Sequence, residues 1–293
     1  MERLLNMYEA KIGVIGGSGL YQIEGMTNIQ EVKPKTPFGE PSDDIIIGEL
    51  GGRNIAFLPR HGRGHYVSPS DIPSRANIYA LKSLGVEWII SVNAVGSLKE
   101  GIHPLDIVIP DQLIDRTKSR VNSFFGDGLV AHVTFAEPFC PVLSNMLYQA
   151  SIDVGANVHP EGTYIVMEGP LFSTKAESNL YRSWGASIIG MTALPEAKLA
   201  REAEICYATL ACITDYDTWH ETEESVTIEI ALANLARSAD IAKKIINIAA
   251  ARIPEGRECG CAEALNNAII TAPEKIPERM KKELDLLIGN YIR

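Results

Sequence analysis

The chain has 293 residues, of which 46% are hydrophobic and 22% charged, so it can bury a large hydrophobic core. Its formal net charge is −10 and its Lys and Arg residues are not clustered, which argues against a nucleic-acid partner because the phosphate backbone requires a basic protein face. The N-terminal stretch lacks the apolar segment of a signal peptide and no apolar run is long enough to span a bilayer, so we expect a cytoplasmic protein that does not contact membranes.

Apolar periodicity and turn residues predict strands that alternate with helices along the chain. The turn Gly51-Gly52 joins two of the strands in a hairpin. We predict strands at 11–15, 45–50, 54–58, 88–92, 106–110, 162–167, 187–189 and 207–213, and helices at 74–84, 140–153, 177–184, 194–204, 227–252 and 277–291. This alternation, with no repeat and no linker break, predicts a single α/β domain over 1–293 with a largely parallel central sheet flanked by helices.

A glycine-rich loop, Gly16-Gly17-Ser18-Gly19, follows the first predicted strand. Glycine allows several backbone N–H groups to turn inward around an anion, and the Ser18 hydroxyl adds a further donor. The loop departs from the dinucleotide-binding fingerprint, because Gln22 stands where the third glycine or alanine is required. The pattern favours a phosphate-binding loop over a nicotinamide cofactor site, and an ordinary tight turn remains the alternative.

Three further predicted strands end in groups that suit an anion, a sugar or a base. Arg60 offers a planar fork for a phosphate, and His61 a further donor. His61 and His65 are four residues apart, but the glycines between them argue against a helical metal-binding pair. The residues at these strand ends are Arg60 and His61, Asn93 and Ala94, and Met191 and Thr192.

Two aspartates follow the buried strand predicted at 207–213. Thr214, Asp215 and Asp217 come directly after this apolar run, and open α/β sheets bind ligands outside the carboxyl ends of their strands. Neighbouring acids in a site that excludes water have pKa values pushed apart, which leaves one of them protonated near neutral pH. We therefore expect a proton donor to a nitrogen heterocycle, and a polar turn with two solvated aspartates is the alternative. Phe172 and Met191 offer an apolar surface for a sugar and a base.

Two features remain open at this point. Residues 117–139 form a long irregular segment of the kind that serves as a lid or a subunit contact, and His132 within it reads by itself as a structural loop residue. The chain has five cysteines, and the Cys259-Gly260-Cys261 spacing lacks the two-residue spacer of common zinc and redox pairs. A redox pair, a structural disulfide and two free thiols are all compatible with it.

In order and spacing, these motifs resemble the S-methyl-5′-thioadenosine phosphorylases, in the trimeric-type branch of the purine nucleoside phosphorylase family. The resemblance covers about residues 11–252, and the segment 253–293 with its CxC loop matches less well. It rests on IGVIGGSGL, TPFGEPSD, FLPRHGRGH, NAVGSL, DIVIPDQLIDRT, AEPFCP, EGPLFSTKAES, GMTALPEAKLAREAEICYA and TDYDTWHETEE. The resemblance implies a mixed, partly barrel-like sheet and the phosphorolysis of methylthioadenosine to adenine and 5-methylthioribose 1-phosphate, within methionine and purine salvage.

The resemblance also assigns roles to individual residues. It makes Asp215 and His61 catalytic, with Asp215 accepting from the 6-amino group of adenine and donating a proton to N7. Phosphate is bound by Ser18, Arg60, His61, Asn93, Ala94 and Thr192, where Ser18 and Asn93 replace threonines of a well-known form of the family. Nucleoside is bound by Met191, Phe172, Thr214, Asp215, Asp217 and His132, where His132 is lent by a neighbouring subunit. Ser173 and Ile228 match positions that tune the choice of substrate.

The family also implies that no metal and no organic cofactor is needed, since inorganic phosphate is the co-substrate, and that the chain forms a homo-oligomer. Thermophilic archaeal members resemble this chain in the CxC region and form disulfides and hexamers built from trimers, which implies oxidation of Cys259–Cys261 and of a second pair among Cys140, Cys206 and Cys212. Three rival functions are a purine nucleoside phosphorylase that accepts adenosine, inosine or guanosine, a hydrolytic nucleosidase, and a non-catalytic nucleotide-binding module.

Overall fold

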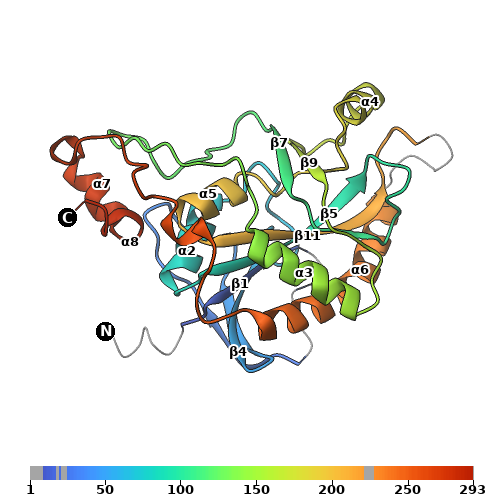
Figure 1. The fold of residues 1–293 in the computed structure, drawn as a ribbon, viewed down its shortest axis with the longest axis horizontal. Coiled ribbons are helices and arrows are strands. Elements are labelled where there is room, and N and C mark those ends of the chain that lie inside the picture. The colour runs from blue at the N-terminus through green and yellow to red at the C-terminus, as the bar shows by residue number, and fades with distance from the viewer. Residues whose placement is uncertain (1–8, 18–19, 21–24, 221–227, 293) are drawn as a thin grey trace.

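Eleven strands in the described part of the chain form one mixed sheet (Figure 1). The computed structural model describes residues 9–17, 20, 25–220 and 228–292. The strands are β1 (Ile12–Gly16), β2 (Thr27–Val32), β3 (Ile45–Leu50), β4 (Arg53–Pro59), β5 (Trp88–Ser97), β6 (Ile107–Val108), β7 (Gln112–Arg116), β8 (Val158–His159), β9 (Thr163–Met167), β10 (Ile188–Gly190) and β11 (Cys206–Tyr216).

The centre of the sheet is parallel. β1 pairs with β4 and β5, and β11 runs parallel to β5 over almost the whole length of both strands. Antiparallel pairs extend this core: β2 with β3, β3 with β4, and β10 with the far end of β5. β9 and β7 continue from β10 in parallel, while β6 pairs with β11 and β8 pairs with β6. The mixed, largely parallel α/β sheet expected from the sequence is confirmed.

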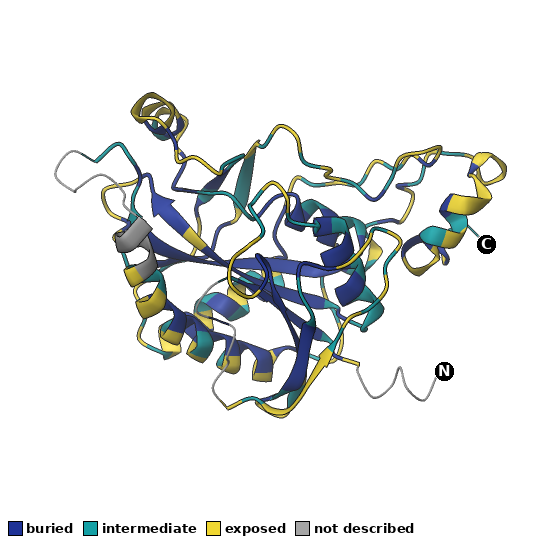
Figure 2. Ribbon diagram, turned by 180° about the vertical axis from the view of Figure 1, so that it is seen from behind, coloured by how far each residue is buried: buried dark blue, intermediate teal, exposed yellow. Residues whose placement is uncertain are grey.

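Helices cover both faces of the sheet, because successive residues of a strand point to opposite sides. Trp88 and Ile90 of β5 share a core cluster with α3 and α6, whereas Ile89 shares one with α2 and α5. In Figure 2 the central strands are dark blue and the outer surfaces of the helices carry most of the exposed yellow. The helices are α2 (Ser74–Ser83), α3 (Pro141–Asp153), α4 (Lys175–Ser183), α5 (Glu196–Glu202), α6 (Ile228–Arg252), α7 (Glu278–Glu283) and α8 (Asp285–Ile288), with 3₁₀ turns η1 (Gly260–Glu263) and η2 (Pro273–Lys275).

Most predicted elements are confirmed within one to three residues, and four differences stand out. The exposed strand β2, the strand β7 and the short strand β8 were not predicted. The predicted helix 277–291 is instead two short helices, α7 and α8, that divide at Leu284. Residues 117–139 form neither helix nor strand, as predicted.

The two strands that carry the predicted site are longer than expected. β5 continues through Asn93 and Ala94 to Ser97, and β11 continues through Thr214 and Asp215 to Tyr216. A polar side chain is tolerated there when it has a partner within the sheet, and Thr214 Oγ1 lies 3.3 Å from Val95 O. The pairing of β11 with β5 shifts its register between Ile213 and Asp215, which marks a β-bulge. The expectation that the strand ends before Thr214 was therefore wrong. The bulge changes the direction of the side chains that follow it, relative to a regular strand.

Candidate active site

A cavity of about 250 Å³ lies against β5, β10 and β11. Two larger hollows, of about 540 and 530 Å³, contain none of the residues predicted for the site. The cavity near β5 contains eight of them: His61, Ala94, Phe172, Met191, Thr192, Thr214, Asp215 and Asp217. Val95, Met167, Ile189 and Leu235 complete its apolar wall. The structure thus brings together chain segments more than 150 residues apart.

Asp215 is the titratable group of this cavity whose properties best suit a proton donor. Burial raises its pKa to about 7, and the charge of Asp217 adds to the effect, while a hydrogen bond from Thr214 opposes it. That hydrogen bond runs from Thr214 Oγ1 to Asp215 Oδ2 and measures 2.6 Å. A carboxyl group with this pKa carries a proton for a large part of the time at neutral pH.

Asp217 is held in a fixed orientation next to Asp215. The hydroxyl of Ser173 donates to Asp217 Oδ2 at 2.6 Å, and the Asp217 backbone N–H donates to Ser97 O at 3.0 Å. Both side chains of the Ser173–Asp217 pair are buried. Ser173 is absent from the cavity wall, so this structure places it behind Asp217.

His61 lines the cavity with a neutral ring. Burial, followed by the neighbouring charge of Arg60, lowers its pKa to about 4. Its Nδ1 lies 2.9 Å from Val67 O, and because a carbonyl only accepts hydrogen bonds, Nδ1 must carry the proton. The ring stacks on His65 with 4.3 Å between centroids. Nε2 is then the nitrogen with a free lone pair for a ligand.

Arg60 lies behind the cavity and does not line it. Its guanidinium is buried and binds Glu196 through two bonds, from Nε to Oε2 at 2.8 Å and from Nη2 to Oε1 at 3.0 Å. It also donates to Val92 O at 2.9 Å and to Ser91 Oγ at 2.7 Å. The fork that the sequence assigns to phosphate is therefore occupied by a carboxylate in this structure.

A row of closely spaced polar side chains links this buried ion pair to the cavity. Ser91 Oγ lies 3.0 Å from Asn93 Oδ1, and Asn93 Nδ2 donates to Thr192 Oγ1 at 2.5 Å. Asn93 is buried and absent from the cavity wall, whereas Thr192 lines it. Arg60 and Asn93 thus orient Thr192 from behind.

Three predicted residues lie outside this arrangement. His132 is exposed on the long irregular segment, and its backbone N–H donates to Ala268 O in the C-terminal segment at 2.9 Å. Ser18 lies outside the described residues, and for Ile228, the first residue of α6, only the backbone is described.

Sequence reasoning missed Glu196, whose carboxylate also accepts hydrogen bonds from Ser91 Oγ at 2.6 Å and from Tyr207 Oη at 2.8 Å. An arginine at the end of a buried strand predicts an acidic partner, because a buried guanidinium charge is costly unless it is paired. Nothing in the sequence pattern says which of the 37 acidic residues does so.

The group of side chains best suited to hold a metal lies elsewhere. The sulfur atoms of Cys140, Cys206, Cys259 and Cys261 all lie within 4.8 Å of one another, and no disulfide is formed. Cys212 is buried in β11 and does not belong to this group. None of the helices among the described residues is both long and apolar enough to cross a membrane.

Comparison with known proteins identifies the family. A family model described as the phosphorylase superfamily matches residues 11–250. A relative from Geobacter sulfurreducens named S-methyl-5′-thioadenosine phosphorylase is 56% identical, over 97% of this chain and 100% of the relative. A relative of the same name from Thermosynechococcus vestitus is 54% identical, over 97% of this chain and 99% of the relative.

Solved structures agree with this result. A methylthioadenosine phosphorylase from an Antarctic soil metagenomic library is 52% identical and has a TM-score of 0.90, covering 96% of this chain and 99% of its own. Methylthioadenosine phosphorylase from Schistosoma mansoni in complex with adenine is 33% identical with a TM-score of 0.80, covering 96% and 98%. The chain therefore belongs to the phosphorylase superfamily.

Proposed function

We propose that the chain catalyses the phosphorolysis of S-methyl-5′-thioadenosine, which yields adenine and 5-methylthioribose 1-phosphate. The observation that carries this proposal is the cavity at β5, β10 and β11, where the half-buried acid Asp215 faces the same space as the donor and acceptor groups of His61 and Thr192. The names of the relatives, which match along almost their whole length, support the same reaction.

The purine occupies the half of the cavity that contains Asp215. When the bond from ribose to purine breaks, negative charge develops on the base, and the protonated carboxyl of Asp215 neutralises it at N7. General-acid catalysis of this kind accelerates a reaction by roughly 10²–10⁴-fold. The carboxyl oxygen that is not protonated accepts from the 6-amino group. A short hydrogen bond from Thr214 fixes the orientation of Asp215, and the Ser173–Asp217 hydrogen bond fixes the Asp217 carboxylate beside the base.

Phosphate occupies the half that contains His61 and Thr192, with Ala94 beside it and with Ser18 as the predicted loop donor. Neutral His61 accepts a hydrogen bond from a protonated phosphate oxygen through Nε2, because Nδ1 is committed to Val67 O. Arg60 and Asn93 lie behind this half of the cavity. Glu196 holds the Arg60 guanidinium in place, and Asn93, which contacts Ser91, donates to the Thr192 hydroxyl and so orients it. The phosphate stabilises positive charge on the ribose ring and then attacks its anomeric carbon. Residues of the chain supply each of these roles, and no organic or metal cofactor enters the reaction.

The apolar wall around Met191 and Phe172 binds the sugar and its methylthio group. Phe172 is 48% exposed and Leu171 next to it is 81% exposed, which fits a face that a second copy of the chain covers. We place His132 of a neighbouring copy over this open side, within a trimer or a hexamer. Light scattering coupled to size exclusion tests the assembly, and a monomer at micromolar concentration with full activity would contradict it.

The experiment that tests the proposed function compares kcat/KM for methylthioadenosine, adenosine and inosine at saturating phosphate. We expect methylthioadenosine to be preferred and inosine to react poorly, because a protonated Asp215 suits N7 and a 6-amino group. A preference for inosine would overturn the assignment of the base. Adenosine belongs in the comparison because a related structure is described as an adenosine/methylthioadenosine phosphorylase.

A further inference from the structure

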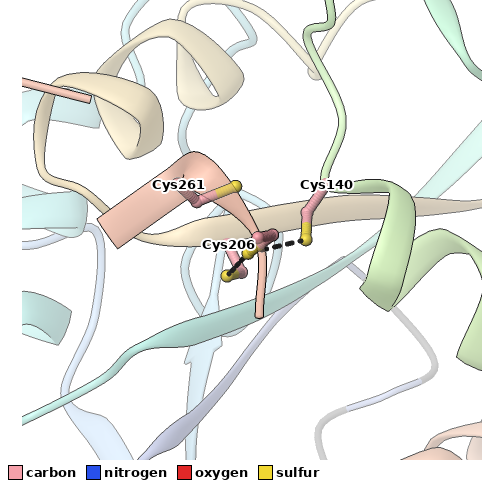
Figure 3. A group of neighbouring side chains, drawn as sticks. Cys140, Cys206 and Cys261 are labelled. Carbon is pink, nitrogen blue, oxygen red and sulfur yellow. Dashed lines mark hydrogen bonds between the residues drawn. The ribbon is translucent and has the colours of Figure 1, made fainter. Parts of the chain in front are cut away.

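Four of the five cysteines, which come from three separate parts of the sequence, meet at one point. Cys206 Sγ lies 3.2 Å from Cys259 Sγ, which in turn lies 3.6 Å from Cys140 Sγ. The sulfur of Cys261 belongs to the same group, all of whose sulfurs lie within 4.8 Å of one another. Figure 3 shows Cys140, Cys206 and Cys261 converging from three different elements. We call these four residues the cysteine cluster.

The cluster is a closed site in the protein interior. Cys140 precedes the first turn of α3, Cys206 begins β11, and Cys259 and Cys261 belong to the C-terminal segment at η1. Cys140, Cys206 and Cys261 are buried and Cys259 is half-buried. The start of a helix favours a thiolate, because its unpaired N–H groups and its dipole are positive. Four sulfurs that converge from buried or half-buried cysteines are the ligand set of a structural metal site.

The spacing of the sulfurs fits one tetrahedral metal ion. A Zn–S distance of about 2.3 Å in a regular tetrahedron places the four sulfurs about 3.8 Å apart, which is close to the observed 3.2 and 3.6 Å and within the 4.8 Å limit of the group. An iron–sulfur cluster inserts its own irons and sulfides between the thiolates, so it requires them to be farther apart. Soft thiolate ligands in tetrahedral geometry indicate zinc or an iron–sulfur centre, and the short distances between the sulfurs favour zinc.

The arrangement does not favour particular disulfide pairs. Cys259 lies within 3.6 Å of both Cys140 and Cys206, so it is shared between two neighbours. The pairing implied by the family resemblance places Cys259 with Cys261 and allows Cys212 in the second pair, but Cys212 lies outside the cluster. A shared sulfur is typical of a common ligand set rather than of two separate bonds.

We propose that Cys140, Cys206, Cys259 and Cys261 bind one Zn²⁺ as a structural tetrathiolate site. The ion ties the C-terminal segment to the sheet at a place where this segment already contacts Glu204: Arg257 donates to its carbonyl, and Leu265 N and Tyr291 Oη donate to its carboxylate. Cys206 stands nine residues before Asp215 on an extended strand, which places it about 30 Å from the proposed proton donor. The ion therefore acts on stability and takes no part in phosphorolysis.

Metal analysis of the intact protein tests this site. The chain is produced without a histidine tag and purified under anaerobic conditions without chelators, and its metals are counted by inductively coupled plasma mass spectrometry. We expect one zinc ion per protomer in the unaltered chain and in Cys212→Ser, the matched control at a buried cysteine outside the cluster. Cys206→Ser and Cys261→Ser should lose the zinc almost completely. Zinc-free protein, zinc retained in both variants, or iron in place of zinc would each overturn the proposal.

A second measurement covers the case in which the cysteine variants fail to fold. Unaltered chain produced in cobalt-supplemented, zinc-depleted medium should show the intense thiolate-to-cobalt charge-transfer bands of a tetrahedral tetrathiolate centre, and Cys212→Ser should show the same spectrum. Alkylation of the unfolded chain without reductant should then label five thiols once the metal is removed. Missing cobalt bands, or a mass that corresponds to one or two disulfides in anaerobically purified protein, would refute the site.

Discussion

Replacing Asp215 with asparagine should abolish most of the activity without disturbing the fold. The side chain keeps its size, and its amide oxygen can still accept from Thr214 Oγ1, which lies 2.6 Å from Asp215 Oδ2. It can no longer release a proton to the departing base. We therefore expect kcat for methylthioadenosine to fall by about 10²–10⁴-fold, which corresponds to about 3–5 kcal/mol of transition-state stabilisation.

The same substitution should stabilise the protein at alkaline pH. The pKa of Asp215 rises from an ordinary 3.8 to about 7, chiefly through burial. The unfolded chain releases this proton at lower pH than the folded one, so the free energy of unfolding falls as pH rises from about 4 to about 7. The full effect is at most about 4 kcal/mol, and it is absent below pH 4. Asparagine does not ionise, so Asp215→Asn should be more stable than the unaltered chain at pH 8 and equal to it at pH 4.

Steady-state adenine release at saturating phosphate measures the first effect, and urea unfolding at pH 4, 6, 7 and 8 measures the second. Asp240→Asn is the matched control, since Asp240 is exposed on α6 and forms a surface ion pair with Lys243 at 3.6 Å. A kcat within about tenfold of the unaltered chain, or a stability difference that does not grow with pH, would refute the assignment of Asp215 as a proton donor with a raised pKa.

Three further predictions follow from neighbouring contacts. First, kcat/KM for methylthioadenosine should fall above about pH 7 as Asp215 loses its proton, and a pH profile that stays flat to pH 9 would contradict this. Second, Glu196→Gln leaves the Arg60 charge buried without its partner and should cost about 3–5 kcal/mol in urea unfolding. Glu255→Gln removes an exposed partner of Arg53 and Lys11 and should cost far less, because water screens exposed ion pairs; equal losses would refute the role of the buried pair. Third, His61→Ala should lower kcat/KM for phosphate by about ten- to a hundredfold, the value of a hydrogen bond to a charged group, and should leave KM for methylthioadenosine nearly unchanged; the opposite split would move His61 out of the phosphate half.

The sequence was informative where local chemistry determines local structure. Gly51 and Gly52 both have positive φ, of 59° and 76°, and this turn permits the hairpin of β3 and β4. The apolar runs before Arg60 and Asp215 are strands because they are buried on both faces. The parallel strands β4, β5 and β11 therefore each bring at least one predicted residue to one cavity, and Met191 and Thr192 reach it from the end of β10, which runs antiparallel to β5.

The sequence failed where distant side chains decide the outcome. β5 and β11 continue past Asn93 and Thr214 because Thr192 and Val95 O bind these polar groups, and such partners are invisible in a window of neighbouring residues. β2 is exposed along nearly its whole length, so it lacks the apolar alternation that signals a strand. The Glu196 partner of Arg60 and the cysteine cluster depend on residues that only the completed fold brings together.

Product analysis of the reaction with methylthioadenosine tests directly whether the chain catalyses phosphorolysis. The chain is incubated with the nucleoside with and without inorganic phosphate, and adenine and the sugar product are identified by chromatography and ³¹P nuclear magnetic resonance. We predict adenine and a sugar 1-phosphate in equal amounts, and no reaction without phosphate. Adenine released together with free methylthioribose in phosphate-free buffer, or no adenine under either condition, would contradict the account.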